Sequence, residues 1–217
     1  MSNSASSAIP APVPAPAAAG SVETVLPGVL RWSAYSPTHK VELTSHAVAI
    51  ESGTGLVFDP IPLTAEIWDW FPPAGPPLGI VLTNDNHERD TAAWRALFPV
   101  PVWAPPEFTA APAGLQKWNT GPNPESPYQG WNIVPLPGGA PGESAWYCAA
   151  RSLVVFGDAV VNLEGRTLEL LPDKYCTAPA RLRQSLRALV ERGFDHALFA
   201  HGKPLIGSAS RRIAALL

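Results

Sequence analysis

The chain has 217 residues and carries 15 Lys and Arg against 18 Asp and Glu, so its net charge is −3 at neutral pH. This balance gives no basic footprint for nucleic acid, and no stretch reaches the run of about 20 apolar residues that spans a bilayer. The amino-terminal end lacks the basic start and apolar stretch of a secretory signal. We therefore expect a cytoplasmic protein with no nucleic-acid partner and no membrane contact.

Residues 1–24 consist mainly of Ser, Ala and Pro, with almost no large side chains. Such a segment buries too little apolar surface to offset its ordering entropy, so its composition predicts a disordered tail. Residues 25–217 have an ordinary length for one domain with its own core, and their sequence contains no further linker. We therefore expect a tail followed by a single domain.

Short runs rich in β-branched and aromatic residues predict five strands in the first half of the domain. These are Val29–Tyr35, Val41–Ile50, Gly55–Asp59, Gly79–Thr83 and Val100–Ala104, with a hairpin turn at residues 53–54. Ala65–Phe71 predicts a short helix that ends before two prolines. Asp85 and Glu88 have the spacing of a capping box, which predicts a second helix that begins near Asn86 and runs through residues 91–98.

The second half begins with the segment 111–128, which is polar and rich in Pro and Gly and therefore predicts a loop. Four further strands are predicted at Trp131–Leu136, Ser144–Ala149, Leu153–Phe156 and Ala197–Ala200. Ala178–Arg192 places its apolar residues on one face and predicts an amphipathic helix, and Ser208–Leu217 predicts a terminal helix. This order of strands and helices favours an α/β fold with mixed sheets and outer helices.

Five segments resemble, in the same order, the elements that define the metallo-β-lactamase superfamily. They are Ser45–Pro60 (the opening hairpin), Thr83–Asp90 (in place of T-H-x-H-x-D-H), Pro137–Ser144 (in place of P-G-H-T-P-G-S), Gly157-Asp158 and His201-Gly202. The segment after residue 82 is also similar to a divergent subgroup with T-N-x-x-H-x-R in place of the His-rich motif. The resemblance implies a metallo-β-lactamase-type αβ/βα four-layer sandwich, with two mixed β-sheets and helices on the outer faces. It also implies metal-assisted hydrolysis as the ancestral chemistry.

The resemblance further implies that one metal site of the family is lost. Asn84 and Asn86 stand at the first two His positions of the motif, and Gly139 stands at the third. These three imidazoles would build one of the two sites. Arg89 replaces another His, and its fixed positive charge would repel a divalent cation unless the side chain turns away to pair with a carboxylate.

The second site keeps more of its ligands. Glu88 stands at the Asp position of the motif, Asp158 matches the bridging Asp, and His201 matches the last His. The resemblance thus implies either one divalent cation, Zn or Mn, held by these three residues, or no metal. Asp158 and His87 are the candidate catalytic residues, and the candidate pocket-lining residues are Asn84, Asn86, Arg89 and Glu143.

Two functions remain open on these residues. The first is metal-assisted hydrolysis of a small ester, thioester or lactone at a mononuclear site. The second is a catalytically inactive, metal-free domain that binds a small ligand or serves as a scaffold, in which Arg89 pairs with the carboxylates. Each polar residue also has a structural interpretation. Asn84 can satisfy backbone groups at a turn, and His87 can be an exposed loop residue.

Overall fold

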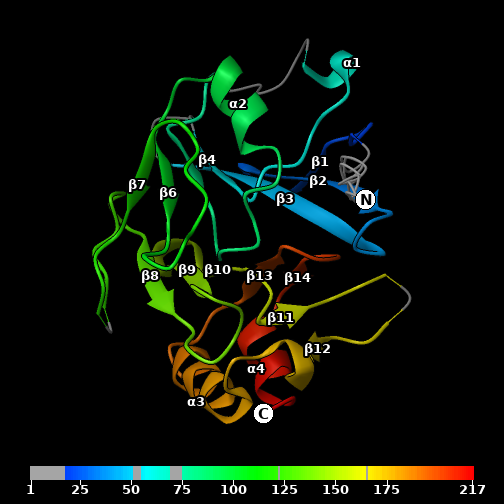
Figure 1. Ribbon diagram of the computed structural model, residues 1–217. Coiled ribbons are helices and arrows are strands. Elements are labelled where there is room, and N and C mark those ends of the chain that lie inside the picture. The colour runs from blue at the N-terminus through cyan, green and yellow to red at the C-terminus, as the bar shows by residue number, and fades with distance from the viewer. Residues whose placement is uncertain (1–17, 51–54, 69–74, 122, 165) are drawn as a thin grey trace, which may run out of the picture.

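The computed structural model describes residues 18–50, 55–68, 75–121, 123–164 and 166–217. The first sheet has seven strands in chain order, antiparallel from β1 to β4 and parallel from β4 to β7 (Figure 1). These strands are β1 (Glu23–Leu26), β2 (Val29–Ser36), β3 (Val41–Ala49), β4 (Gly55–Phe58), β5 (Gly79–Val81), β6 (Val102–Ala104) and β7 (Leu115–Lys117).

The second sheet has five strands in the order β14-β13-β10-β9-β8, and in it β10 and β13 are parallel while the other neighbours are antiparallel. These strands are β8 (Asn132–Pro135), β9 (Ser144–Cys148), β10 (Leu153–Phe156), β13 (His196–Phe199) and β14 (Leu205–Ile206). A separate antiparallel ribbon consists of β11 (Val160–Val161) and β12 (Glu169–Leu170).

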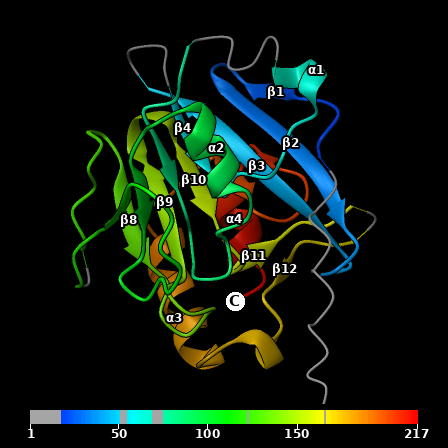
Figure 2. The same ribbon diagram turned by 45° about the horizontal axis from the view of Figure 1, so that its top comes forward.

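Helices lie outside the two sheets. They are α1 (Ala65–Trp68), α2 (Thr91–Leu97), α3 (Pro179–Val190) and α4 (Ala209–Ala214), with 3-10 turns η1 (Ala149–Arg151) and η2 (Asp173–Tyr175). Figure 1 shows α1 and α2 at one end of the stack and α3 and α4 at the other, and Figure 2 shows α2 across the front of the first sheet. Among the residues described, no helix is long and apolar enough to cross a membrane.

Three apolar clusters join these layers. Trp94 of α2 stacks on Trp32 of β2, with ring centroids 5.4 Å apart. Between the sheets, Phe58 of β4 meets Trp146 of β9 edge-on at 5.9 Å. Leu186 of α3 is fully buried against the second sheet. Because burial of one large apolar side chain contributes about 1.5–3 kcal/mol, these contacts hold the order helices, sheet, sheet, helices. The predicted four-layer αβ/βα sandwich is confirmed.

Two strands lie where the sequence predicted irregular structure. β1 begins at Glu23, inside the predicted tail, and the preceding Ala19 is buried and bridges to Leu63. β7 lies inside the predicted loop 111–128 and pairs with β6. Both are sheet-edge strands that are held by backbone hydrogen bonds and lack a strongly apolar pattern. Residues 1–17 of the predicted tail, the predicted turn at 53–54 and the last three residues of the predicted first helix lie outside the described residues.

The predicted capping box was wrong, because α2 begins at Thr91 and not near Asn86. Arg89 has a φ of 44°, in the left-handed region, which interrupts any right-handed helix that starts before it. The carboxylate of Asp85 accepts a hydrogen bond from the backbone N–H of Thr109 at 2.5 Å instead of capping α2. Residues 84–90 therefore form a turn at the edge of the sheet.

Candidate metal centre

The site forms where strands of both sheets end. Asp59 directly follows β4, and His87 lies in the turn after β5, which is parallel to β4 in the first sheet. Asp158 follows β10, and His201 follows β13, which is parallel to β10 in the second sheet. Because parallel strands bring their carboxyl ends to the same edge, each sheet contributes two of these side chains to one place between the sheets.

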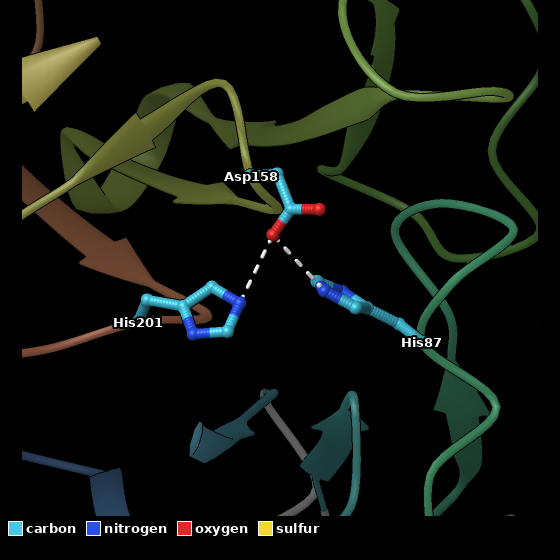
Figure 3. A group of neighbouring side chains, drawn as sticks. All are labelled: His87, Asp158 and His201. Atoms are coloured by element: carbon cyan, nitrogen blue, oxygen red, sulfur yellow. Dashed lines mark hydrogen bonds and ion pairs between the residues drawn. The ribbon is translucent and has the colours of Figure 1, made fainter. Parts of the chain in front are cut away.

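Three of these side chains converge on a single point (Figure 3). Nε2 of His87 lies 3.1 Å from Oδ1 of Asp158, and Nε2 of His201 lies 3.0 Å from the same oxygen. The three atoms that could ligate a metal all lie within 4.8 Å of one another. His87 is buried, and the other two side chains are mostly buried. We call His87, Asp158 and His201 the central cluster.

The other nitrogen of each imidazole also faces an acceptor. Nδ1 of His87 lies 3.0 Å from Oδ2 of Asp59, and Nδ1 of His201 lies 2.9 Å from the backbone carbonyl of Glu42. Asp59 is itself fixed, because it accepts hydrogen bonds from the backbone N–H and the hydroxyl of Thr83 at 2.8 and 2.7 Å. These partners orient both rings so that Nε2 points at Asp158, as in metal sites where a carboxylate or carbonyl holds the ligating histidine.

A neutral imidazole has one N–H and cannot satisfy two acceptors. Each ring of the central cluster has an acceptor at Nδ1 and the Asp158 oxygen at Nε2. For His87, these two contacts are met either by a second proton on the ring or by a cation between Nε2 and the carboxylate. The ring centroids of His87 and His201 are only 5.7 Å apart, so one cation could meet both Nε2 atoms at once.

Burial and the neighbouring carboxylates shift the pKa of His87 in opposite directions. Burial lowers the pKa of the ring, but the charges of Asp158 and Asp59 outweigh it and raise the pKa to about 9. Burial likewise raises the pKa of Asp158, yet the charge of His87 and hydrogen bonds from both histidines hold that pKa well below its usual value. Without a metal, His87 is therefore an imidazolium between two carboxylates.

An amide and a carboxyl group lie where the resemblance places the first metal site of the family. The side-chain N–H groups of Asn84 donate to Oε2 of Glu143 at 2.9 Å and to Oδ2 of Asp158 at 3.1 Å. Glu143 also accepts the backbone N–H of Ala159 at 2.9 Å. A Cβ added at Gly139 would lie 2.8 Å from Cγ of Glu143. Glu143 thus occupies the space beside Gly139.

The environment of Glu143 disfavours its charged form. Burial and the nearby charge of Asp158 raise the pKa of its carboxyl group to about 8, although the hydrogen bonds from Ala159 and Asn84 oppose this. Glu143 is buried and borders the central cluster through Asn84. Glu143 is therefore a buried neighbour of the central cluster and not a solvated surface residue.

Arg89 turns away from the carboxylates. Its guanidinium donates hydrogen bonds to the backbone carbonyls of Thr44 at 2.6 Å, Asp59 at 2.9 Å and Ala200 at 3.1 Å. Thr44 lies in β3 and Asp59 follows β4 of the first sheet, whereas Ala200 follows β13 of the second, so Arg89 links the two sheets beside the central cluster. The expected ion pairs between Arg89 and Glu88, Glu143 or Asp158 are not present among the described residues.

Glu88 and Asn86 do not join the site. Both side chains are exposed, and the hydrogen bonds described for Glu88 use its backbone carbonyl, which accepts from the hydroxyl and the backbone N–H of Thr91. His87, one residue before Glu88, points inward to Asp158 instead. The ligand set assigned from the resemblance therefore changes, with His87 in place of Glu88.

Sequence reasoning also missed the residues that orient the rings. Asp59 was visible only as the last residue of an apolar run before a proline, and Glu42 as one acidic residue inside a predicted strand. An Asp-Pro pair at a strand end is the one signal that could have marked Asp59. The carbonyl of Glu42 has no sequence signal, because every residue has the same backbone carbonyl oxygen whatever its side chain.

No protein-family model matches the chain, and no curated protein matches it. Solved structures match over nearly the whole chain. The DIM-1 metallo-β-lactamase exposed to ceftazidime is 16% identical, with a TM-score of 0.70 over 95% of this chain and 98% of that one. A metallo-β-lactamase from Erythrobacter litoralis with β-mercaptoethanol in its active site is 12% identical, with a TM-score of 0.70 over 90% and 94%. The di-iron-bound form of TTHA1623 is 20% identical, with a TM-score of 0.59 over 80% and 94%. The chain therefore has the metallo-β-lactamase fold, as the five sequence elements predicted.

Proposed function

We propose that this chain is a metallo-β-lactamase-fold hydrolase-like protein that binds one divalent cation, Zn or Mn, through His87, Asp158 and His201. The observation that carries the proposal is the orientation of the two imidazoles. Each ring has its Nδ1 engaged by Asp59 or by the carbonyl of Glu42 and directs its Nε2 to the same carboxylate oxygen. One cation satisfies all three groups.

The donor set fits such a cation. Two imidazole nitrogens and one carboxylate oxygen are ligands that Zn and Mn accept, and three protein ligands leave a position open, as in catalytic sites. Arg89 is no obstacle, because three backbone carbonyls occupy its guanidinium. When bound, a cation of this kind polarises an acyl oxygen and makes water a nucleophile at neutral pH.

The protein's own residues supply the positioning. Asp59 holds the ring of His87, and the amide of Asn84 holds the second oxygen of Asp158 while it also binds Glu143. Small esters, thioesters and lactones are the proposed substrate class, because their acyl bonds suit a mononuclear site. The structurally similar proteins named metallo-β-lactamases agree with hydrolysis as the reaction type.

The alternative is a metal-free domain without catalytic activity that binds a small ligand or serves as a scaffold. It is favoured by a specific observation: protonated His87 donates to Asp59 and Asp158 and closes the cluster without any cation. In this alternative the imidazolium takes the place of the metal, and chelators leave the free energy of unfolding unchanged.

Elemental analysis of the purified full chain, after dialysis against zinc or manganese, decides between the two. We expect about one equivalent of metal per chain in the wild type and in Glu88→Gln, whose side chain is exposed, and loss of the metal in Asp158→Ala and His87→Ala. Absence of metal from the wild type would support the metal-free alternative. Loss of metal in Glu88→Gln would restore the ligand set assigned from the resemblance.

A further inference from the structure

A cavity of about 310 Å³ lies beside the central cluster, at the ends of β8 and β9 and the start of α3. Its walls are mainly apolar and include Pro105, Pro124, Pro137 and Trp118. Its size is at the low end of small-molecule sites, so it suits a compact ligand. Trp118 is buried behind this surface and meets Trp146 edge-on at 5.8 Å, which keeps the wall rigid.

The inner end of this cavity is linked to the central cluster. Glu143 lines the cavity and is only 4% exposed. Its Oε2 accepts a hydrogen bond from Asn84, which also donates to Asp158. The side chain of Glu143 therefore lies between a ligand in the cavity and Asn84, the residue that donates a hydrogen bond to Asp158. A molecule held here lies next to the residues to which we assign hydrolysis.

Two charged side chains line the same cavity from different elements. Arg181 lies in the first turn of α3, is exposed, and its guanidinium has no hydrogen-bond or ion-pair partner among the described residues. The first turn of α3 contains no acidic residue and no side-chain cap, so the positive end of the helix adds to the charge of Arg181. Glu107 lines the cavity next to Pro105 and is also exposed.

We propose that this cavity binds the carboxylate-bearing end of a small apolar substrate. The carboxylate lies against Arg181 and away from Glu107, and the apolar body lies on Trp118 and the prolines, directed toward Glu143. The two opposite charges thus set the orientation of the ligand, because an anion is attracted to one wall and repelled from the other. The nature of the hydrolysed bond rests on the proposed function, but binding in the cavity does not.

The test uses the full chain treated with a chelator, so that metal binding plays no part. Phenylacetate and phenylacetamide differ only in their charged or neutral end, and their affinities are measured by isothermal titration calorimetry. We expect phenylacetate to bind about fivefold more tightly than phenylacetamide, as for one partly exposed charged hydrogen-bonded pair. Arg181→Gln should abolish this preference, and Glu107→Gln should increase it.

Arg183→Gln is the matched control, because Arg183 lies on the same helix but pairs with Asp173 at 2.8 Å and does not line the cavity. It should leave the preference unchanged, while Arg181→Lys, which keeps the charge, should retain most of it. Equal affinities for the acid and the amide, tighter binding of phenethylamine, or no binding of either probe would overturn the proposal. A protein that binds metal but shows no preference for the acid refutes only the cavity assignment. Preference for the acid without metal binding supports the cavity and refutes only the metal site.

Discussion

Oδ2 of Asp59 lies 3.0 Å from Nδ1 of His87, and both side chains are at least 95% buried. The pair orients the ring toward Asp158, so Asp59 would act on a metal at the proposed site only through His87. Asp59→Asn removes the charge and one acceptor while it keeps the size of the side chain. We expect it to lower the affinity for zinc by about 10- to 100-fold, measured by competition with a chelating dye.

Asp85→Asn is the control for this substitution, because Asp85 lies in the same turn but bonds to Thr109 outside the cluster. Its zinc affinity should equal that of the wild type. An Asp59→Asn protein with unchanged affinity would show that the orientation of His87 does not depend on the carboxylate.

The metal-free protein should lose stability as the pH rises through the alkaline range. The pKa of His87 is raised from 6.5 in the unfolded chain to about 9 in the folded one, so its contribution is complete below 6.5 and is lost as the pH approaches 9. The loss is about 3 kcal/mol at about 1.4 kcal/mol per pH unit. The pKa of Glu143 is also raised, from 4.5 to about 8, so its contribution to stability is likewise lost as the pH rises from about 4.5 to 8.

Urea unfolding at a series of pH values, in the presence of a chelator, measures this effect. The slope between pH 6.5 and 9 should be shallower in His87→Gln, which cannot bind the extra proton. A free energy of unfolding that rises over this range in the wild type would contradict the assignment of His87 as an imidazolium.

A histidine placed at residue 139, where the resemblance expects an imidazole, should destabilise the protein. In Gly139→His the new Cβ lies within 2.8 Å of Cγ of Glu143 and within 3.1 Å of its Cβ. Such overpacking costs about 1–3 kcal/mol, measured as a lower urea midpoint, and no second equivalent of metal should appear. The double variant Gly139→His/Glu143→Ala should recover part of the loss, because it removes the side chain in the way.

Arg89→Lys keeps the positive charge but cannot donate to three carbonyls in the geometry of a guanidinium. We expect the free energy of unfolding to fall by about 1–3 kcal/mol, because the carbonyls of Thr44, Asp59 and Ala200 lose partners. Metal content should stay near that of the wild type. Arg95→Lys, on α2 and bonded to the carbonyls of Val100 and Ala113, tests whether any arginine of this kind has the same effect.

The layered fold could be predicted because its inner strands are apolar runs bounded by Gly, Pro and polar residues. The run of residues 153–156 was predicted with its observed bounds, and α3 was placed within two residues at each end. The edge strands β1 and β7 could not be found in this way. Backbone hydrogen bonds hold these strands in place, and such bonds leave no pattern of apolar side chains in the sequence.

The candidate site could be predicted only in part, and for a local reason. Asp158 and His201 each lie two residues after the end of a strand, so the end of the strand sets their place. The turn 84–90 has no regular geometry and contains the left-handed residue Arg89, and in it His87 points inward while Glu88 is exposed. Alignment of motifs assumes that equivalent positions face the same way, and this turn breaks that assumption.

The hydrogen bonds from Arg89 to three backbone carbonyls of the two sheets have a consequence for folding. Thr44 and Asp59 belong to the first sheet, and Ala200 belongs to the second. The central cluster is divided in the same way, with His87 from one half of the chain and Asp158 and His201 from the other. Neither half can therefore assemble the site on its own, and separation of the two halves at this contact would take the site apart. Metal bound at the proposed site would report that the two halves have docked.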